Sequence, residues 1–427
     1  MTGAPLAGLV VVEFAQYLSG PLAGLRLADL GARVIKIERP VTGDPCRGLF
    51  ISEPVHGENT LFHAINRGKE SLVADLRNPA DRARLRALLC RADVVIQNFR
   101  PGVIERQGFG WDVVRALNPA LVYAAISGFG DTDWRDLPGQ DLLAQARAGL
   151  VWLSGSRDDP PVPMGLALAD MLSGEALVQG ILAALVARGR TGQGALVETS
   201  LLEALLSFQF EVLTTHLNDG GKPPQRAAAG GAHAYVGAPY GIYPTADGWL
   251  ALAMTPSLAG LGELMGLPAL REQAAPGPVD RDAVRTLIVA ATPSRTTQAW
   301  LDLLQPHDIW CAEVLDWPAL RAHPVWAQIG IQRRFGAPAQ GAPAQGGLAH
   351  GMRTTPGETP LGMPTTGAPG FGFGFDGIAG PLRVDGVRPG STRAAPALGA
   401  DTDRIIKDFG LDRPDARTGA SPVEQAI

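Results

Sequence analysis

Asp170 is the carboxylate whose surroundings most suggest chemistry. It ends an apolar stretch that begins at Gly165, and an apolar helix is expected to start just after it, at Glu175. An aspartate in this place can be an N-cap that accepts hydrogen bonds from the first N–H groups of the helix. It can also be a nucleophile, because poor hydration makes a carboxylate more reactive while a helix N-terminus keeps it ionised. Both roles can hold at once, and the surrounding residues leave the choice open.

Arginines at strand ends form a second pattern. Arg39 closes a predicted strand, and Arg77 and Arg106 follow at comparable strand exits. Open α/β sheets bind their ligands at the carboxyl ends of the strands. A single surface arginine is usually only a solvated charge. Several arginines at one edge would suit a ligand that carries multiple phosphates.

Other chemistries find little support. The three cysteines and seven histidines are dispersed, and their spacing predicts neither a metal site nor a disulfide framework. No Gly-x-Ser-x-Gly elbow of a serine hydrolase occurs. One match to the dinucleotide fingerprint exists, at Gly372, Gly374 and Gly377. It lacks a preceding strand and a following helix, since Pro381 comes soon after, so we expect no nicotinamide site there.

The elements that must position these residues alternate along the chain. Strands are expected at residues 9–14, 33–38, 72–75, 94–97 and 121–126, and helices at 22–30, 79–89, 111–117 and 175–187. This alternation indicates an open α/β sheet of parallel strands. Residues 218–232 are rich in Gly and Pro and predict a crossing to a smaller second lobe. Residues 336–375 predict a long surface loop.

Composition narrows the class of protein. Hydrophobic residues make up 46% and charged residues 19%, and the net charge is −5. These values are typical of a globular protein and do not favour nucleic-acid binding. The N-terminus lacks the features of a signal peptide, and the longest apolar run, at 176–187, is shorter than the roughly 20 residues that span a bilayer. We therefore expect a cytoplasmic protein without a membrane partner.

A set of motifs resembles the family III CoA-transferases, which include formyl-CoA transferase, carnitine CoA-transferase and the α-methylacyl-CoA racemases. The motifs span most of the chain and are Gly20-Pro21, residues 27–38, Gly43-Asp44, residues 98–102, residues 117–119, residues 127–130, residues 180–185, residues 191–194, residues 395–399 and residues 401–403. The resemblance implies a Rossmann-like large lobe formed by both chain ends (1–217 and 325–427). It also implies a smaller inserted α+β lobe (218–324) and an interlocked homodimer.

The resemblance also assigns roles. Asp170 would be the covalent nucleophile, attacking an acyl-CoA thioester to give an aspartyl-acyl anhydride and free CoA thiolate, which then returns to form an aspartyl-CoA thioester. The incoming carboxylic acid would complete the exchange through a second anhydride, with coenzyme A as substrate and no permanently bound cofactor or metal. Coenzyme A would lie against Leu18, Ser19, Arg39, Ala74, Asp75, Leu76, Arg77, Asn98, Phe99, Arg100 and Arg106. The segment from Gly230 to Pro239, which contains Gly237, would correspond to the glycine-rich loop of formyl-CoA transferase.

Gln140 separates two branches of the family. The racemases carry a histidine in a Gly-His-Asp motif, and this chain has Gly139-Gln140-Asp141. A neutral amide cannot take a proton from an α-carbon, so a two-base racemisation loses one partner. We therefore expect CoA transfer between carboxylic acids. The alternative is an acyl-CoA epimerase or isomerase that uses Asp170 as a base.

Overall fold

The computed structural model describes residues 4–49, 59–253, 255, 257–273, 280–336 and 374–412. Its strands are β1 (Val10–Glu13), β2 (Arg33–Glu38), β3 (Glu70–Val73), β4 (Val94–Gln97), β5 (Val122–Ser127), β6 (Leu196–Ser200), β7 (Gly241–Pro244), β8 (Trp249–Leu252), β9 (Cys311–Glu313), β10 (Gln332–Phe335) and β11 (Phe375–Ile378). Its helices are α1 (Ser19–Asp29), α2 (Thr60–Asn66), α3 (Pro79–Leu89), α4 (Val103–Arg106), α5 (Trp111–Leu117), α6 (Asp141–Arg147), α7 (Leu168–Thr191), α8 (Leu201–Phe208), α9 (Phe210–Asn218), α10 (Leu258–Met265), α11 (Ala269–Gln273), α12 (Arg281–Ala291), α13 (Thr297–Leu304), α14 (Trp317–Ala322), α15 (Pro324–Ile329) and α16 (Thr402–Phe409).

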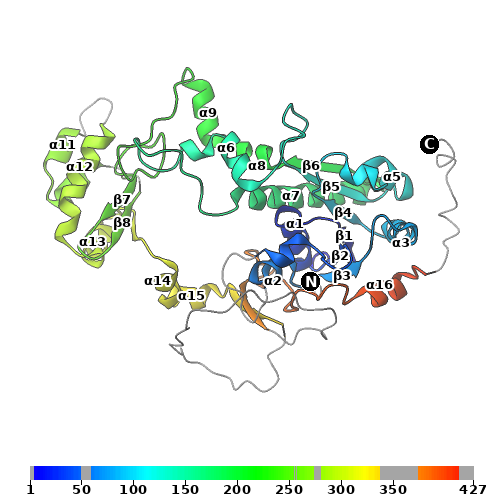
Figure 1. Cartoon of the computed structure of the whole chain (residues 1–427). Coiled ribbons are helices and arrows are strands. Elements are labelled where there is room, and N and C mark those ends of the chain that lie inside the picture. Colours follow the sequence, from blue (N-terminus) through cyan, green and yellow to red (C-terminus); the bar gives the residue numbers. More distant parts are fainter. Residues whose placement is uncertain are drawn as a thin grey trace, which may run out of the picture.

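Strands β1 to β6 form one parallel sheet in the order β3-β2-β1-β4-β5-β6. Successive side chains alternate between two buried faces: Val11 packs in the cluster that contains residues of α1 and α7, and Val12 packs in the cluster that contains residues of α3 and α16. Figure 1 shows α7 and α8 on one side of this sheet and α3 and α5 on the other. The predicted α/β class and parallel sheet are confirmed.

The strand order creates a switch point. From β1 the chain moves outward through β2 and β3, returns to place β4 on the other side of β1, and continues through β5 and β6. Loops that leave β1 and β4 therefore diverge at the carboxyl edge, which is where open α/β sheets bind ligands. Ser19 follows β1 and Asn98 follows β4, so both lie at this point.

The C-terminal segment packs against the outer strand β3. Asp401 Oδ2 accepts a hydrogen bond from Ser71 N at 3.0 Å, and Thr402 Oγ1 accepts one from Val73 N at 3.1 Å. These side chains satisfy backbone donors on the strand's free edge, which would otherwise be open to pairing with another strand. Ile405 and Phe409 of α16 are buried in the same cluster as the helices that cover that face.

A second core lies apart from the large sheet. Strands β7, β8 and β9 form an antiparallel sheet, and a separate cluster around Tyr243, Leu250, Val284 and Trp300 joins it to α10, α12 and α13. Figure 1 shows this unit at the opposite end of the molecule from β1 to β6. The exact division into lobes at residues 218 and 324 stays a prediction.

Helix α7 passes through the first core. By length and composition it is the one described helix that could cross a membrane. Here it packs against α1, α8, β5 and β6 instead. Such a long apolar helix is equally typical of a core, and in this chain its first turn carries Asp170.

Candidate active site

Asn98 fastens the β1–α1 loop at the switch point. Its Oδ1 accepts a hydrogen bond from Gln16 N at 2.8 Å, and its Nδ2 donates to Gln16 O at 2.8 Å and to Ser19 Oγ at 3.2 Å. Ser19 is buried and in turn makes a side-chain hydrogen bond to Asp170. A continuous chain of polar contacts therefore runs from the end of β4 to Asp170.

Asp170 is not the N-cap that its position before Glu175 suggested. Helix α7 begins at Leu168, so Asp170 lies inside the first turn, and the flanking Ala167 offers no side-chain cap. The cap comes from Asp141 instead: its Oδ1 accepts hydrogen bonds from Ala169 N at 2.6 Å and from Asp170 N at 3.2 Å. The Asp170 carboxylate therefore does not cap α7.

Burial is the largest cause that raises the pKa of Asp170 above its ordinary value of 3.8, and the charge of Asp141 acts in the same direction. The hydrogen bond from Ser19 opposes both, and the net result is a pKa of about 6. At pH 7 roughly nine-tenths of such a group is ionised. The partial positive charge at the start of α7 also favours the anion. Asp170 is therefore a poorly hydrated carboxylate that is still charged at neutral pH, which is the state a nucleophile needs.

Close packing of glycines brings these groups together. A Cβ placed on Gly174 of α7 would lie 2.7 Å from the carbonyl oxygen of Ser19, and one on Gly139 would lie 2.5 Å from the Cα of Gly128. The first approach lets the start of α1 reach α7, and the second brings the segment before Asp141 against the end of β5. Any larger residue would force the backbones apart.

Most of the residues expected to contact coenzyme A lie at one edge of the sheet. Arg39 follows β2, Ala74 to Arg77 follow β3, and Asn98 to Arg100 follow β4. Arg39, Arg100 and Arg106 are exposed. Arg77 is exposed as well and makes an ion pair with Asp75, with 3.1 Å between Nε and Oδ1. Parallel register brings these side chains to the same side as Ser19, while their contact with coenzyme A stays a prediction.

Other predicted residues lie differently. Gln140 is exposed and flanks the start of α6 without capping it. Within the described part of the chain, no hydrogen bond joins its side chain to Asp170. Gly237 is exposed in the turn before β7, where its carbonyl oxygen accepts a hydrogen bond from Tyr240 N. The described residues contain no cluster of His, Cys, Asp and Glu that could hold a metal.

The dinucleotide fingerprint and the predicted surface loop both involve the segment between β10 and β11. Gly372 of the dinucleotide fingerprint lies outside the described residues, as does most of the predicted loop at 336–375. Gly377 lies in β11, which pairs with β10 in an antiparallel ribbon. The second half of the fingerprint therefore does not open a helix, as a phosphate-binding turn would require.

Sequence reasoning missed Asp141 as part of the site. The motif at residues 139–141 drew attention to Gln140, whereas the structure shows that its neighbour caps α7 and adds charge beside Asp170. Gln145 was also missed. It is buried and donates to Asp141 Oδ2 at 2.6 Å, while its Oε1 accepts a hydrogen bond from Met164 N at 3.0 Å. In the sequence, the only sign of this contact is that Asp141 and Gln145 are four positions apart, about one helical turn.

The fold and the site have known counterparts. The model of CoA-transferase family III matches residues 6–369. A crystal structure of a CaiB/BaiF family protein from Brucella suis superposes with a TM-score of 0.76 at 29% identity, covering 96% of this chain and all of that one. The protein Rv3272 from Mycobacterium tuberculosis superposes with a TM-score of 0.73 at 26% identity, covering 94% of this chain and 99% of that one. The chain belongs to CoA-transferase family III.

Curated relatives narrow the chemistry. An acetyl-CoA:oxalate CoA-transferase from Acetobacter aceti is 33% identical over 73% of this chain and 81% of its own length. A succinyl-CoA:mesaconate CoA-transferase from Haloarcula hispanica is 34% identical over 70% of this chain and 78% of its own. A succinate–glutarate CoA-transferase from Agrobacterium fabrum is 41% identical over 58% of this chain, and the match spans 63% of that relative. The class of this protein is that of enzymes that transfer coenzyme A between acids.

Proposed function

We propose that this protein moves coenzyme A from an acyl-CoA thioester to a carboxylic acid, with Asp170 as the covalent nucleophile. The observation that carries this proposal is the state of Asp170: partly buried at the start of α7, hydrogen-bonded by Ser19, and with a pKa raised to about 6 by burial and by Asp141. A carboxylate in this state is charged at neutral pH and needs little desolvation before it attacks.

The proposed reaction conserves activated acyl groups at every step. The Asp170 carboxylate attacks the thioester carbonyl, the C–S bond breaks, and an aspartyl-acyl anhydride and CoA thiolate result. The thiolate then attacks the aspartyl carbonyl, which releases the donor acid and forms an aspartyl-CoA thioester. The acceptor carboxylate attacks that thioester to give a second anhydride, and CoA thiolate attacks its acyl carbonyl to release product and regenerate Asp170. Each step exchanges one activated carboxyl for another.

The bound coenzyme A would lie along the carboxyl edge of strands β1 to β4. Arg39, Arg77, Arg100 and Arg106 would hold its phosphates through charge-assisted hydrogen bonds. Leu18, Ala74, Leu76 and Phe99 would line its path, with Asn98 and Ser19 nearest the nucleophile. Support comes from the shared edge and from the exposed guanidinium groups of these arginines.

The acceptor we propose is a short dicarboxylic acid. The relatives named for oxalate, mesaconate, glutarate, citramalate and malate all act on acids of this kind. A panel of succinyl-, glutaryl- and acetyl-CoA donors against labelled dicarboxylates tests this, with transfer of label into a CoA thioester as the expected result. Deuterium incorporation at the α-carbon without exchange of coenzyme A would instead indicate an epimerase.

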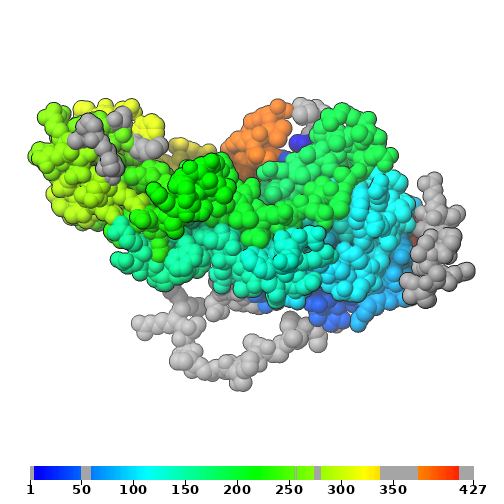
Figure 2. All heavy atoms as spheres, turned by 90° about the horizontal axis from the view of Figure 1, so that it is seen from above, coloured from blue at the N-terminus to red at the C-terminus, as the bar shows by residue number. Residues whose placement is uncertain are grey.

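We further propose a homodimer. Leu206, Phe208, Phe210 and Leu217 of α8 and α9 are 38%, 52%, 71% and 79% exposed, and they adjoin a groove of about 940 Å³ whose lining includes Trp152. Figure 2 shows the green segment that includes α8 and α9 at the surface between the two ends of the molecule. Exposed apolar surface of this extent is typical of an interface, and a second copy of this chain is the occupant we propose. Light scattering should give twice the chain mass for the native protein and a lower mass for Phe210→Asp; a monomeric native protein would refute the dimer.

A further inference from the structure

The backbone of Tyr17 has an unusual conformation. Its φ is +62°, in the left-handed region, although it is neither glycine nor asparagine. Such a conformation is strained for a residue with a side chain and persists only where surrounding contacts enforce it. Tyr17 lies between Gln16, which Asn98 holds, and Leu18 and Ser19, which lead into α1. The conformation of this residue therefore sets how the chain enters α1, and it acts together with the hydrogen bond from Asn98 Nδ2 to Ser19 Oγ in placing Ser19 relative to Asp170.

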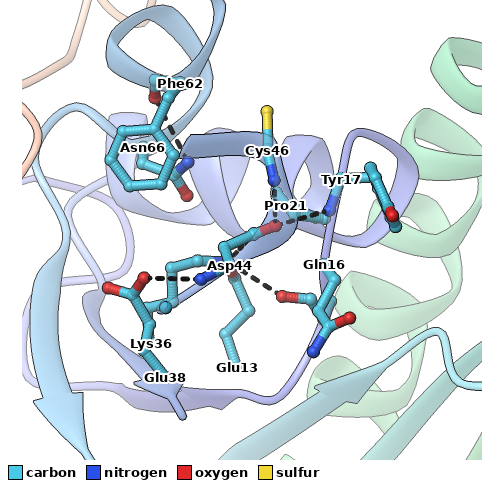
Figure 3. Close-up of polar contacts among 12 residues, drawn as sticks. Glu13, Gln16, Tyr17, Pro21, Lys36, Glu38, Asp44, Cys46, Phe62 and Asn66 are labelled. Atoms are coloured by element: carbon cyan, nitrogen blue, oxygen red, sulfur yellow. Dashed lines mark hydrogen bonds and ion pairs between the residues drawn. The ribbon is translucent and has the colours of Figure 1, made fainter. Parts of the chain in front are cut away.

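Asp44 enforces the conformation of Tyr17. Asp44 is 2% exposed, and its Oδ1 accepts hydrogen bonds from Tyr17 N at 3.1 Å and from Cys46 N at 2.9 Å. Its Oδ2 makes an ion pair with Lys36 Nζ at 2.8 Å. Figure 3 shows Asp44 at the centre of these contacts, with the Tyr17 ring pointing away from them.

Lys36 connects this contact to the body of the sheet. Its ammonium group is fully buried on β2 and donates to Glu13 Oε1 at 2.9 Å and to Ala15 O at 2.8 Å. Lys69, also fully buried, donates to the same Glu13 and to Pro21 O at 2.8 Å. Although burial works against its charge, the carboxylates of Glu13 and Asp44 hold the pKa of Lys36 above its ordinary value.

We infer that Asp44 is a positioning residue for the transfer reaction: by holding the Tyr17 backbone against the Lys36 ion pair, it places Ser19 within hydrogen-bond reach of Asp170. This inference rests on the proposed function, since it assigns an effect on Asp170 chemistry. Asp44 acts through Tyr17 and Ser19 and does not itself contact substrate.

Asparagine cannot fill this role. Its single side-chain oxygen can accept from Tyr17 N, but its NH₂ group then faces the Lys36 ammonium, so that two donors meet; rotating the amide satisfies Lys36 and loses Tyr17. In Asp44→Asn we expect Ser19 to lose its hydrogen bond to Asp170. Because that bond lowers the pKa of Asp170, the carboxyl should titrate about half to one pH unit higher.

The test compares Asp44→Asn with Asp29→Asn. Asp29 is 6% exposed and forms a buried ion pair with Arg67, so its replacement removes a comparable buried charge away from residues 15–19. We expect Asp44→Asn to lower kcat about 10- to 100-fold with little change in KM for acyl-CoA. We expect it also to raise the Asp170 titration, measured by infrared difference spectroscopy against Asp170→Asn. Asp29→Asn should lose stability without either change.

A second variant separates positioning from loss of fold. Glycine adopts left-handed backbone freely, so Tyr17→Gly should make the Asp44 contact less necessary, and the double variant Tyr17→Gly, Asp44→Asn should regain part of the kcat that Asp44→Asn loses. An unchanged Asp170 titration in Asp44→Asn, or equal losses of kcat with and without Gly at position 17, would overturn the inference. A shifted titration of Asp170 in Asp44→Asn together with full activity of Asp170→Asn would instead overturn the proposed function, and it would leave standing only that Asp44 places Ser19 next to Asp170.

Discussion

Replacing Asp141 by asparagine should lower the pKa of Asp170. The substitution removes the charge beside Asp170 but keeps a side-chain oxygen, which can still accept the N–H groups of Ala169 and Asp170 and so cap α7. Loss of charge and loss of the cap are therefore separable at this position. That makes Asp141→Asn the sharpest available perturbation of the nucleophile's electrostatics.

The size of the effect follows from Coulomb's law. Asp141 Oδ1 lies 3.2 Å from Asp170 N, and the charge of Asp141 acts on the Asp170 carboxyl. For two unit charges roughly 6 Å apart, in a medium with an effective dielectric constant between about 20 and 80, the repulsion is about 0.7–2.8 kcal/mol, or about 0.5–2 pH units. Burial is the larger cause of the whole rise from 3.8 to about 6. The lower half of the range therefore applies, and we expect a decrease of about one pH unit or less.

The assay is the single-turnover rate of acyl transfer from acyl-CoA onto the enzyme between pH 4 and 8. At pH 5 about a tenth of Asp170 is ionised in the native protein, and about half would be ionised if its pKa were about 5. The rate at pH 5 should thus rise about three- to fivefold in Asp141→Asn and stay nearly unchanged at pH 8. Gln145→Ala removes the hydrogen bond to Asp141 Oδ2 without removing charge. It should therefore not shift the acid limb of the pH–rate profile to lower pH. An acid limb that stays in place or moves upward in Asp141→Asn would refute the electrostatic account.

Four further outcomes are expected. Ser19→Ala removes the hydrogen bond that lowers the pKa of Asp170, so its acid limb should move to higher pH. Gly174→Ala should reduce kcat at least tenfold, because the new Cβ would lie 2.7 Å from the carbonyl oxygen of Ser19. Arg106→Ala should raise KM for acyl-CoA about tenfold through loss of a charge-assisted phosphate contact, with kcat little changed. The folded state binds the Asp170 proton more tightly than the unfolded state does, so the free energy of unfolding in urea should fall as the pH rises from about 4 to about 6. Asp170→Asn should remove that decline.

Matched variants check these outcomes. Gly189→Ala lies on the same helix as Gly174, but its Cβ would meet nothing within 4 Å, so it should leave kcat unchanged and slightly stabilise α7. Arg271→Ala removes an exposed arginine, 77% accessible, from outside the proposed CoA path and should leave KM unchanged. Equal effects of Gly174→Ala and Gly189→Ala, or of the two arginine changes, would contradict the assigned positions. A urea stability that falls equally in wild type and Asp170→Asn would contradict the raised pKa.

Local signals predicted much of the sheet and its helices. The bounds of α3 were predicted as observed because Asn78 caps the helix from its own side chain and Pro79 opens it. The start of α7 was predicted too late because its cap is not local. Ala167 has no capping oxygen, and Asp141, 28 positions before Ala169, supplies it. A prediction made from neighbouring residues cannot detect a cap that a residue of another helix supplies.

The buried charges show the same limit. Along the sequence Glu13 only interrupts an apolar strand, yet in the structure it is fully buried between Lys36 and Lys69. Its meaning depends on strand order, which places β1 beside β2 and brings Lys69 close by. Asp44 likewise acts on Tyr17, a residue distant along the chain. The location of the arginines at strand ends was predictable because parallel strands share one carboxyl edge. The buried ion pairs of Glu13 and Asp44 with lysines were not predictable.

Trapping the enzyme-bound intermediate tests the central claim most directly. The protein is incubated with succinyl-CoA and hydroxylamine, digested, and analysed by mass spectrometry, alongside Asp170→Asn. We predict a hydroxamate on Asp170, formed when hydroxylamine attacks the activated aspartyl carbonyl, together with loss of activity, and no such adduct in Asp170→Asn. An unmodified Asp170 in protein that still transfers coenzyme A, or full transfer by Asp170→Asn, would contradict the assignment of Asp170 as nucleophile.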